Sequence, residues 1–409
     1  MLKKVFPLLI FVFIVISCKS NYYKRNTFNY SKPVNTSDKK INRQKKGIFS
    51  IANVEVDNRF DGARMNAFSH LDTLFQIDIL PENIPINPSP WYAFQIKSKK
   101  KDTLIYLKIN YPGGKHRYYP KISSDRIHWK EINRDSIQIA ENKQSIIFRL
   151  SLSAQPVWIA AQPVINSHDV KKWMETLRKK SKVNNVKSIG KSVLNRDIPF
   201  FTIGTEKNNK KNIIILMSRQ HPPEITGFKA LQYFIDELLK ENKLTDSFFK
   251  NNEIWVFPLL NPDGVDLGHW RHNAHGVDLN RDWAYYKQPE IEQVTRYIVN
   301  KAKEKKASVI LGIDFHSTFK DVYYVYNDSV QSVLPRFHTT WTAGIDALLF
   351  PFHTKYAPGK LSSPVSKNWF YNQFKAEGIT YEVGDETPEN LIRKKAQTAA
   401  VMMMSLLIK

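Results

Sequence analysis

Apolar runs and helical patterns alternate along the second half of the chain. An apolar run at 213–217 precedes a helical pattern through 228–239, and further apolar runs cover 309–315 and 379–383. Short apolar runs bounded by polar turns are typical of buried strands, and apolar residues spaced three and four apart are typical of an amphipathic helix. Strands that alternate with helices predict an α/β domain, which we place at residues 164–409.

The segment before this domain has a different pattern, made of short strand-like runs. The alternation of Ile105, Leu107 and Ile109 predicts a strand with one buried face, and Pro-Gly-Gly at 112–114 predicts a turn. Four runs predict strands, and they cover 91–96, 104–109, 146–150 and 157–161. We therefore expect an all-β sandwich domain over residues 47–163.

Polar residues stand at the ends of the apolar runs in the second domain. His221 and Glu224 follow the run 213–217, His316 follows the run 309–315, and Glu382 lies in the last short run. In open α/β sheets, ligands bind beyond the carboxyl ends of the strands. We therefore expect these four side chains to converge, although they are far apart in the sequence.

Two histidines and one carboxylate are the ligand set of a catalytic zinc site, in which the fourth position stays open for water. His221, Glu224 and His316 supply that set for one zinc ion. A carboxylate such as Glu382 can take and return a proton beside such a metal. Arg271 and Arg281 have the chemistry to stabilise an oxyanion and to hold a free carboxylate.

Each of these residues alone has a simpler interpretation. A lone histidine is more often a hydrogen-bonded structural residue, and the Asn-Pro-Asp-Gly sequence at 261–264 is first a turn signal. Glu382 in an apolar strand can be an ion-paired buried carboxylate, although burying it without a role is costly. The combination of these residues, in order and at strand ends, favours the metal site.

These residues resemble the zinc metallocarboxypeptidases of the pancreatic carboxypeptidase type (peptidase family M14), and most closely their cytosolic branch. The His-x-x-Glu pair at 221–224 and His316 in Ile-Asp-Phe-His-Ser match the zinc ligands of that family. Trp369 and Glu382, thirteen residues later, match its final block with the general base. The resemblance implies a mixed-sheet domain with helices on both faces, preceded by a β-sandwich.

The central signature of the same family matches the segment from 261 to 283. By this resemblance, Arg271 is the oxyanion residue, and Asn280 and Arg281 bind the terminal carboxylate of the substrate. Asp278 matches the carboxylate that orients the first zinc histidine, a role that metal sites generally need. The implied activity is hydrolysis of the last peptide bond by a zinc-activated water.

Two positions of the specificity pocket depart from the pancreatic members. Lys360 stands where those members carry a mobile tyrosine, and Tyr356 lies nearby but out of register, as a candidate replacement. Lys367 stands at the base of the pocket, where a cation favours an acidic terminal side chain. The alternative for Lys367 is a solvated lysine with no role in specificity.

The beginning of the chain has the pattern of an export signal. Two lysines precede an apolar run at 5–16, which is too short to span a bilayer but has the length of a signal-peptide core. Cys18, the only cysteine, follows in a sequence that resembles a bacterial lipobox. We expect residues 1–17 to be a lipoprotein signal peptide and Cys18 to be lipidated, with a buried structural cysteine as the alternative. The protein would then be exported and anchored to a membrane of the bacterial cell envelope.

Residues 19–46 carry nine Lys or Arg and one acidic residue, so we expect a basic disordered tether over 18–46. The formal net charge of the whole chain is +23. Its basic residues are scattered and no nucleic-acid motif is present, so we expect no nucleic-acid partner. Attraction of the tether to anionic lipid or cell-wall polymers is a simpler use of this charge, and we interpret most of the lysines as solvated surface residues. We expect a monomer.

The most specific prediction is therefore a lipid-anchored zinc metallocarboxypeptidase that prefers acidic terminal residues. One alternative is a peptidase that acts on peptidoglycan stem peptides. Another is a binding protein that grips peptide ends without cleaving them. Turnover of ordinary peptides separates the first function from both alternatives.

Overall fold

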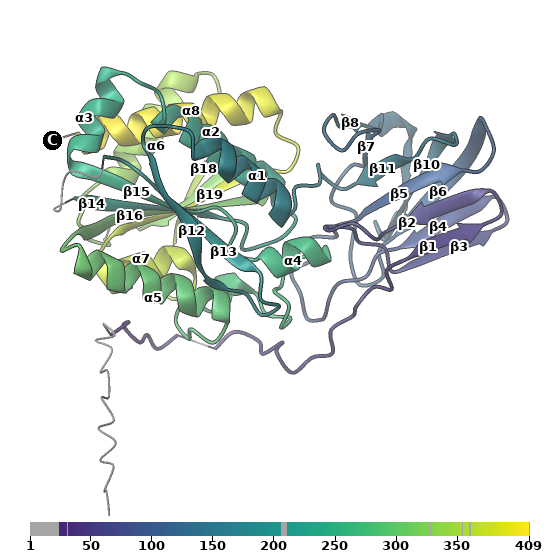
Figure 1. The fold of residues 1–409 in the computed structure, drawn as a ribbon, viewed down its shortest axis with the longest axis horizontal. Helices are drawn as coiled ribbons and strands as arrows, with labels where there is room; N and C mark the ends of the chain where they lie inside the picture. The colour runs from purple at the N-terminus through teal and green to yellow at the C-terminus, as the bar shows by residue number, and fades with distance from the viewer. Residues whose placement is uncertain are drawn as a thin grey trace, which may run out of the picture.

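The computed structural model describes residues 24–30, 32–205, 211–327, 329–353, 355–359 and 361–408. The expected signal peptide, Cys18 and Lys360 lie outside these ranges. In the part of the chain that is described, no helix has the length and apolar character needed to cross a membrane. The described chain forms an all-β region followed by a mixed α/β domain, which confirms the predicted fold class (Figure 1).

The all-β region is a sandwich of two sheets. Its core consists of the inward residues of both sheets, and Ile105, Leu107 and Ile109 are buried in it as their alternation predicts. One sheet has the order β1-β2-β5-β11-β7-β8 and the other β3-β4-β6-β10-β9. The strands are β1 (Ile48–Ile51), β2 (Val54–Asp57), β3 (Ala67–Leu71), β4 (Leu74–Asp78), β5 (Ala93–Ser98), β6 (Thr103–Asn110), β7 (Lys121–Ser123), β8 (Lys130–Glu131), β9 (Ile137–Ile139), β10 (Ser145–Leu152) and β11 (Val157–Ala160), with a short 3-10 helix η1 (Arg134–Ser136) before β9.

The α/β domain contains one mixed sheet of eight strands, in the order β12-β13-β15-β14-β16-β19-β17-β18. The four central strands β15, β14, β16 and β19 are parallel, so their carboxyl ends meet at one edge of the sheet. The strands are β12 (Val183–Lys191), β13 (Asp197–Ile203), β14 (Asn212–Ser218), β15 (Asn252–Phe257), β16 (Ser308–Thr318), β17 (Val322–Tyr326), β18 (Lys355–Gly359) and β19 (Glu377–Gly384).

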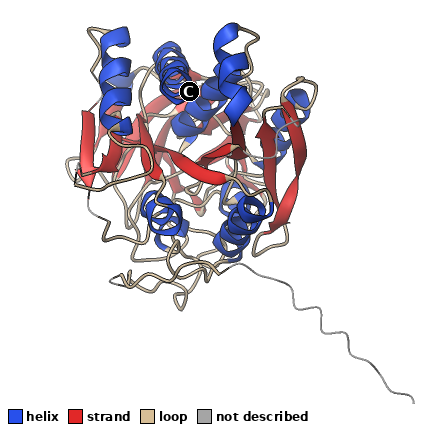
Figure 2. Ribbon diagram, turned by 90° about the vertical axis from the view of Figure 1, so that its left-hand side faces the viewer, coloured by secondary structure: helices blue, strands red, loops and turns tan. Residues whose placement is uncertain are grey.

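Helices cover both faces of this sheet, as Figure 2 shows. One face packs against α2, α3, α6 and α8, and the other packs against α5 and α7, so the sheet lies between two apolar cores. The helices are α1 (Ser167–Leu177), α2 (Ile225–Leu238), α3 (Lys243–Asn251), α4 (Pro262–Leu267), η2 (Leu279–Arg281, 3-10), α5 (Pro289–Glu304), α6 (Phe337–Leu349), α7 (Ser366–Phe374) and α8 (Glu389–Leu407).

The sandwich and the α/β domain share part of their packing. Trp270 and Ile225 of the α/β domain are fully or almost fully buried in the core of the sandwich. A side chain at Gly114 of the sandwich would come within 2.7 Å of the Trp270 ring, so this contact leaves no room for a Cβ atom. Because tight apolar contacts of this kind are lost on separation, the two domains are expected to behave as one unit.

Residues 24–30 and 32–46, which we call the strap, belong to the segment that the composition predicts to be a disordered tether. They form no helix or strand, but they lie along the α/β domain and lead to the sandwich (Figure 1). Arg25 donates hydrogen bonds to the Glu292 carbonyl and to Thr295, and its guanidinium lies 4.5 Å from the centre of the Tyr286 ring. Composition alone missed these contacts because they are made by scattered polar groups.

Candidate metal centre

His221 and Glu224 are placed by the turn between β14 and α2. Arg219 adopts a left-handed conformation (φ 56°), which turns the chain sharply just after the strand. Glu224 is the residue that precedes the first turn of α2. Gly227 then allows this helix to approach β16, because a Cβ atom there would lie 2.4 Å from the carbonyl oxygen of His316. His316 lies within β16 and not beyond its end, since the strand continues to Thr318.

The side chains of His221, Glu224 and His316 converge and are buried. The Nδ1 atoms of His221 and His316 lie 2.8 Å and 2.6 Å from the two oxygens of the Glu224 carboxylate. All three potential ligand atoms lie within 4.8 Å of one another. Burial opposes a charge on His316, but the carboxylates of Asp314 and Glu224 raise its pKa well above the usual value. Three nitrogen and oxygen donors that face one point fit a zinc ion.

Each of the two histidines also contacts a further carboxylate, through the ring nitrogen that does not face Glu224. The Nε2 atom of His221 lies 3.0 Å from Asp278, which the sequence had indicated, and the Nε2 atom of His316 lies 2.8 Å from Asp314, which it had not. Such contacts fix the ring so that Nδ1 remains available as a ligand. A signal for Asp314 was present, because residues two apart on a strand point to the same face.

Asp314 is itself held by several donors from other elements. Its Oδ2 atom accepts a hydrogen bond of 2.5 Å from Gln220 and a short one from the Ser366 hydroxyl at the start of α7. Gln220 in turn accepts a hydrogen bond of 2.9 Å from the Trp283 indole. The turn after β14, the segment after η2 and α7 therefore all contribute to the orientation of His316.

Glu382 lies beside His316, since the two residues are directly paired on the neighbouring parallel strands β16 and β19. Its Oε2 atom has no hydrogen-bond partner in the described part of the chain, although it is buried. Burial raises the pKa of Glu382 to about 7. A carboxylate with an unpaired oxygen and a pKa near neutrality has the properties of a general base.

Arg271, Asn280 and Arg281 come to the same place from the long segment between α4 and α5. The Nε atom of Arg271 donates a hydrogen bond of 2.7 Å to Asp278, the carboxylate that also holds His221. The Asn280 amide lies 3.4 Å from His316 Nε2, and its side-chain oxygen accepts a hydrogen bond from the backbone of Ser366. All three side chains line a pocket of about 360 Å³ together with His221, Glu224, His316 and Glu382.

A family model described as zinc carboxypeptidase (peptidase M14) matches residues 170–401, more than half of the chain. The chain belongs to the zinc carboxypeptidase family. The match covers the residues that converge in the pocket, from His221 to Glu382. Membership supports a hydrolase that uses zinc, and the donor set described above fits that metal.

Curated relatives of this zinc carboxypeptidase cover the chain to different extents. An uncharacterised protein of Zymomonas mobilis, ZMO1242, is 24% identical over 273 residues, which are 64% of this chain and 67% of the relative. Cytosolic carboxypeptidase 6 of mouse is 30% identical over 136 residues, which are 32% of this chain. This chain therefore spans about a quarter of the length of the mouse protein, which is 25% covered.

Solved structures share the fold over almost their whole length. A metallo-carboxypeptidase from Burkholderia cenocepacia has a TM-score of 0.71 at 16% identity, and the match covers 87% of this chain and 98% of the other. A metallo-carboxypeptidase from Pseudomonas aeruginosa, in complex with (2-guanidinoethylmercapto)succinic acid, has a TM-score of 0.69 at 17% identity, with 86% and 98% covered. The fold of a β-sandwich followed by a mixed α/β domain is thus shared with these proteins.

The two specificity positions differ in where the structure places them. Lys367 is 5% exposed and lines the zinc carboxypeptidase pocket, where its Nζ atom donates to the Val325 carbonyl over 3.2 Å and lies 4.3 Å from the centre of the Tyr326 ring. It is therefore not the solvated lysine of the alternative interpretation. Burial lowers its pKa to about 8.

Tyr356, the candidate for the mobile tyrosine, is not brought into the pocket. It lies on the edge strand β18, is 54% exposed and is not among the lining residues. Tyr324, which the sequence interpretation missed, lines the pocket from β17. Tyr356 is paired with Tyr323, and Tyr324, the next residue along β17, points to the opposite face of the sheet, so the register of the strands decides which tyrosine reaches the pocket.

The sandwich also contributes to the pocket, through Asn87 and Arg117. Arg117 donates to the Asp385 carboxylate at 2.7 Å, to Ser89 at 2.6 Å and to the carbonyl of Ser317 at 3.2 Å. Its charge is thus held next to the residue that follows His316. No sequence pattern pointed to these two residues, because they lie in loops of the other domain.

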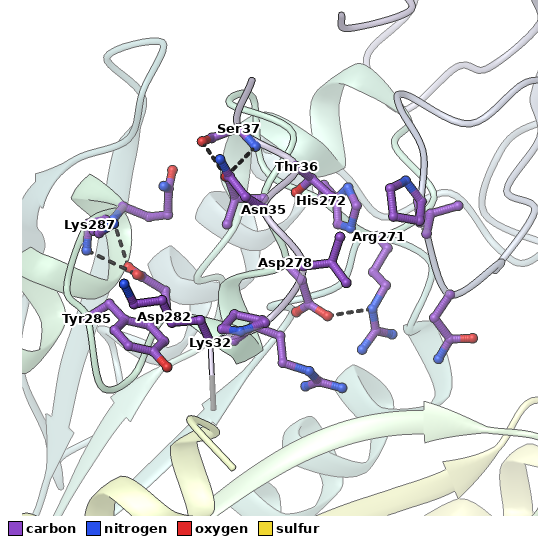
Figure 3. Close-up of a pocket in the computed structure, with 18 residues that line it drawn as sticks. Lys32, Asn35, Thr36, Ser37, Arg271, His272, Asp278, Asp282, Tyr285 and Lys287 are labelled. Carbon is purple, nitrogen blue, oxygen red and sulfur yellow. Dashed lines mark hydrogen bonds and ion pairs between the residues drawn. The ribbon is translucent and has the colours of Figure 1, made fainter. Parts of the chain in front are cut away.

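A second and larger pocket, of about 580 Å³, adjoins the first and shares Arg271 and Arg281 with it. Figure 3 shows strap residues Lys32 and Asn35 on one side of it and Asp278, paired with Arg271, on the other. The Asn-Pro-Asp-Gly turn has a structural role: Asn261 caps the start of α4 and donates to the His272 carbonyl, so it helps to place the segment that carries Arg271.

Proposed function

We propose that this protein removes single residues from the carboxyl ends of peptides. The observation that carries this proposal is the pocket in which the buried His-Glu-His cluster, the unpaired oxygen of Glu382 and the guanidinium groups of Arg271 and Arg281 meet. A single zinc ion held by the three ligands would supply Lewis acidity, which makes a water more acidic and polarises a carbonyl. The chain's own residues supply the other parts of the reaction.

Glu382 takes the proton of the attacking water and returns it to the leaving amine, which needs a carboxylate with a free oxygen at the cleft. Arg271 faces the oxygen of the scissile carbonyl and stabilises its negative charge. Asn280 and Arg281 hold the terminal carboxylate, since an arginine fork matches a carboxylate in two parallel hydrogen bonds. The position of all four side chains around one pocket supports these roles.

We further propose that acidic terminal residues are preferred. Lys367 lines the same pocket from α7, and in the described part of the chain its ammonium group contacts the Val325 carbonyl oxygen and the Tyr326 ring. An acidic side chain of the substrate would supply the carboxylate that this buried cation lacks. The Asp or Glu end of a peptide, or of a peptidoglycan stem peptide, is therefore the partner with the best charge match.

We also propose where the protein is located, on the basis of its N-terminal sequence. Residues 1–18 have the pattern of a lipoprotein signal, which supports a lipid anchor in the bacterial cell envelope, and a monomer is proposed. The test is labelling of the cells with an alkyne fatty acid. Incorporation into the wild type and none into Cys18→Ser supports the anchor, and equal labelling of both contradicts it.

Mass spectrometry of peptides that differ only in their last residue tests the activity. Zinc-loaded wild type should remove single residues, fastest for Glu and Asp, and Glu382→Gln should remove none. Cleavage of muropeptides alone would select the peptidoglycan alternative. Tight binding without turnover of either substrate would select the non-catalytic alternative and end the proposal.

A further inference from the structure

Glu82 of the sandwich makes an unusual set of contacts with the α/β domain. It lies in the loop between β4 and β5 and is 0% exposed. Its carboxylate accepts hydrogen bonds from the backbone N–H groups of Trp270 (2.8 Å), Arg271 (2.9 Å) and His272 (2.6 Å). Burial opposes its ionisation, but His269, His272 and Arg64 nearby and these backbone donors keep its pKa low.

The three amides belong to a segment that has no regular structure of its own. Between the end of α4 at Leu267 and the start of η2 at Leu279 the chain forms no helix or strand. Its backbone donors must therefore find partners elsewhere, and three consecutive donors find one carboxylate. A charged acceptor makes stronger hydrogen bonds than a neutral one, so this contact fixes the backbone at Arg271.

The residues on either side of Arg271 also contact the sandwich. Trp270 is fully buried in the core of the sandwich, and His272 Nδ1 lies 2.6 Å from Asn83, the residue after Glu82. The Arg271 side chain instead extends toward Asp278 (Figure 3), and it lines the pocket that contains the three metal-ligand candidates. The sandwich thus holds the backbone on one side, and the guanidinium group reaches the pocket on the other.

We infer that Glu82 is a positioning residue for the reaction. By holding the backbone of Arg271, Glu82 fixes the position of the Arg271 guanidinium, so the β-sandwich contributes to catalysis. This inference rests on the proposed carboxypeptidase activity and gives the sandwich a role beyond its packing against the α/β domain. A shift of about 1 Å in a group that stabilises a transition state can lower the rate about 100-fold. Loss of the Glu82 charge is therefore expected to act on turnover more than on substrate binding.

The test compares Glu82→Gln with wild type in the full zinc-loaded chain. A glutamine has the same shape, but its NH₂ group is a donor and cannot accept a hydrogen bond. It therefore cannot accept from all three backbone N–H groups. We expect kcat to fall about 10-fold to 100-fold, KM to change less than about threefold, and zinc content to stay at the wild-type value. Affinity for a phosphonate peptide, which mimics the tetrahedral oxyanion, should fall by the same factor as kcat/KM.

A double-mutant cycle separates positioning from general damage. In an Arg271→Met background, Glu82→Gln should lower kcat by less than about twofold, because the group that Glu82 places is absent. Glu253→Gln is the matched control: Glu253 is a buried carboxylate at the start of β15, paired with Lys305 at 2.8 Å, far along the sheet from the pocket. It should leave kcat within about twofold of the wild type.

Several outcomes overturn the inference. An unchanged kcat in Glu82→Gln, or an equal loss with and without Arg271, shows that Glu82 does not act through Arg271. If Glu82→Gln does not fold, Glu82→Asp keeps the charge and withdraws it by one methylene, and the same cycle is run with it. An inactive wild type is a different result, since it removes the proposed function itself.

Discussion

The two walls of the catalytic pocket are built by different means. The metal ligands and Glu382 stand on or next to the central parallel strands of one sheet, where neighbouring strands hold them in register. We call these residues the strand wall. Arg271 stands on an irregular segment, and Asn280 and Arg281 stand on the short helix η2 that follows it; we call these residues the loop wall. Here the carboxylates of Glu82 and Asp278 take the place of strand pairing. The comparison teaches that a loop can be as well fixed as a strand end when charged acceptors satisfy its amides.

The largest effect is expected at Glu382 on the strand wall. Glu382→Gln removes the base without changing the size of the side chain, so kcat should fall by about 10³ or more while zinc content stays unchanged. Steady-state kinetics and metal analysis measure both quantities. Residual activity above about 10% of the wild type would assign the base to another residue.

Removal of the guanidinium group from the loop wall should have the next largest effect. Arg271→Met is expected to lower kcat about 10² to 10³-fold, as loss of an oxyanion donor does, and to change KM little. A rise in KM at constant kcat would show that Arg271 binds the ground state and not the transition state. Glu253→Gln again serves as the control for a buried charged residue.

Asp278 and Asp314 compare the two walls directly, because each orients one histidine. Asp278→Asn and Asp314→Asn should each weaken zinc binding about 10-fold to 100-fold, which competition with a chelator measures. Similar losses would mean that the loop wall holds its carboxylate as firmly as the strand wall. A loss of zinc affinity in Asp314→Asn but not in Asp278→Asn would contradict this equivalence of the two walls.

The preference for acidic residues should depend on pH through Lys367. Burial lowers its pKa to about 8, so the cation is present below pH 8 and is lost as the pH rises through that value. The ratio of kcat/KM for a Glu-ended peptide to that for a Gln-ended peptide should fall between pH 7 and pH 9. In Lys367→Met the ratio should be small and independent of pH, and a wild-type ratio that does not change would assign specificity elsewhere.

The smallest effect is expected on the strap. Lys32 is exposed and lines the second pocket, and an exposed charge contributes about 0–1 kcal/mol. Lys32→Glu should therefore lower kcat/KM for acidic peptides by at most about fivefold. Lys39→Glu, on the same strap but not lining the pocket, is the control. A larger loss at Lys32 would make the strap a part of the substrate site.

Much of the fold was predictable because its signals are local. The expected strands at 104–109 and 146–150 correspond to β6 and β10, and the expected helix at 228–239 corresponds to most of α2. The contacts of the strap could not be predicted from the sequence, because they depend on polar groups such as Arg25 and Glu292 that have no periodic spacing. Sequence position suggested Tyr356 for the pocket, whereas the strand register places Tyr324 there.

By itself, the sequence determined the fold class, and it pointed to the His-Glu-His cluster and to Glu382 beside it. Two histidines and one glutamate are one ligand set of catalytic zinc sites, and apolar periodicity places each of these residues at a strand of one sheet. Only the tertiary structure decided that Glu82 holds the Arg271 backbone and that Arg117 lies beside Ser317. Both contacts join residues about 190 to 200 positions apart in different domains. No local spacing encodes such contacts, because the packing of one domain on the other creates them.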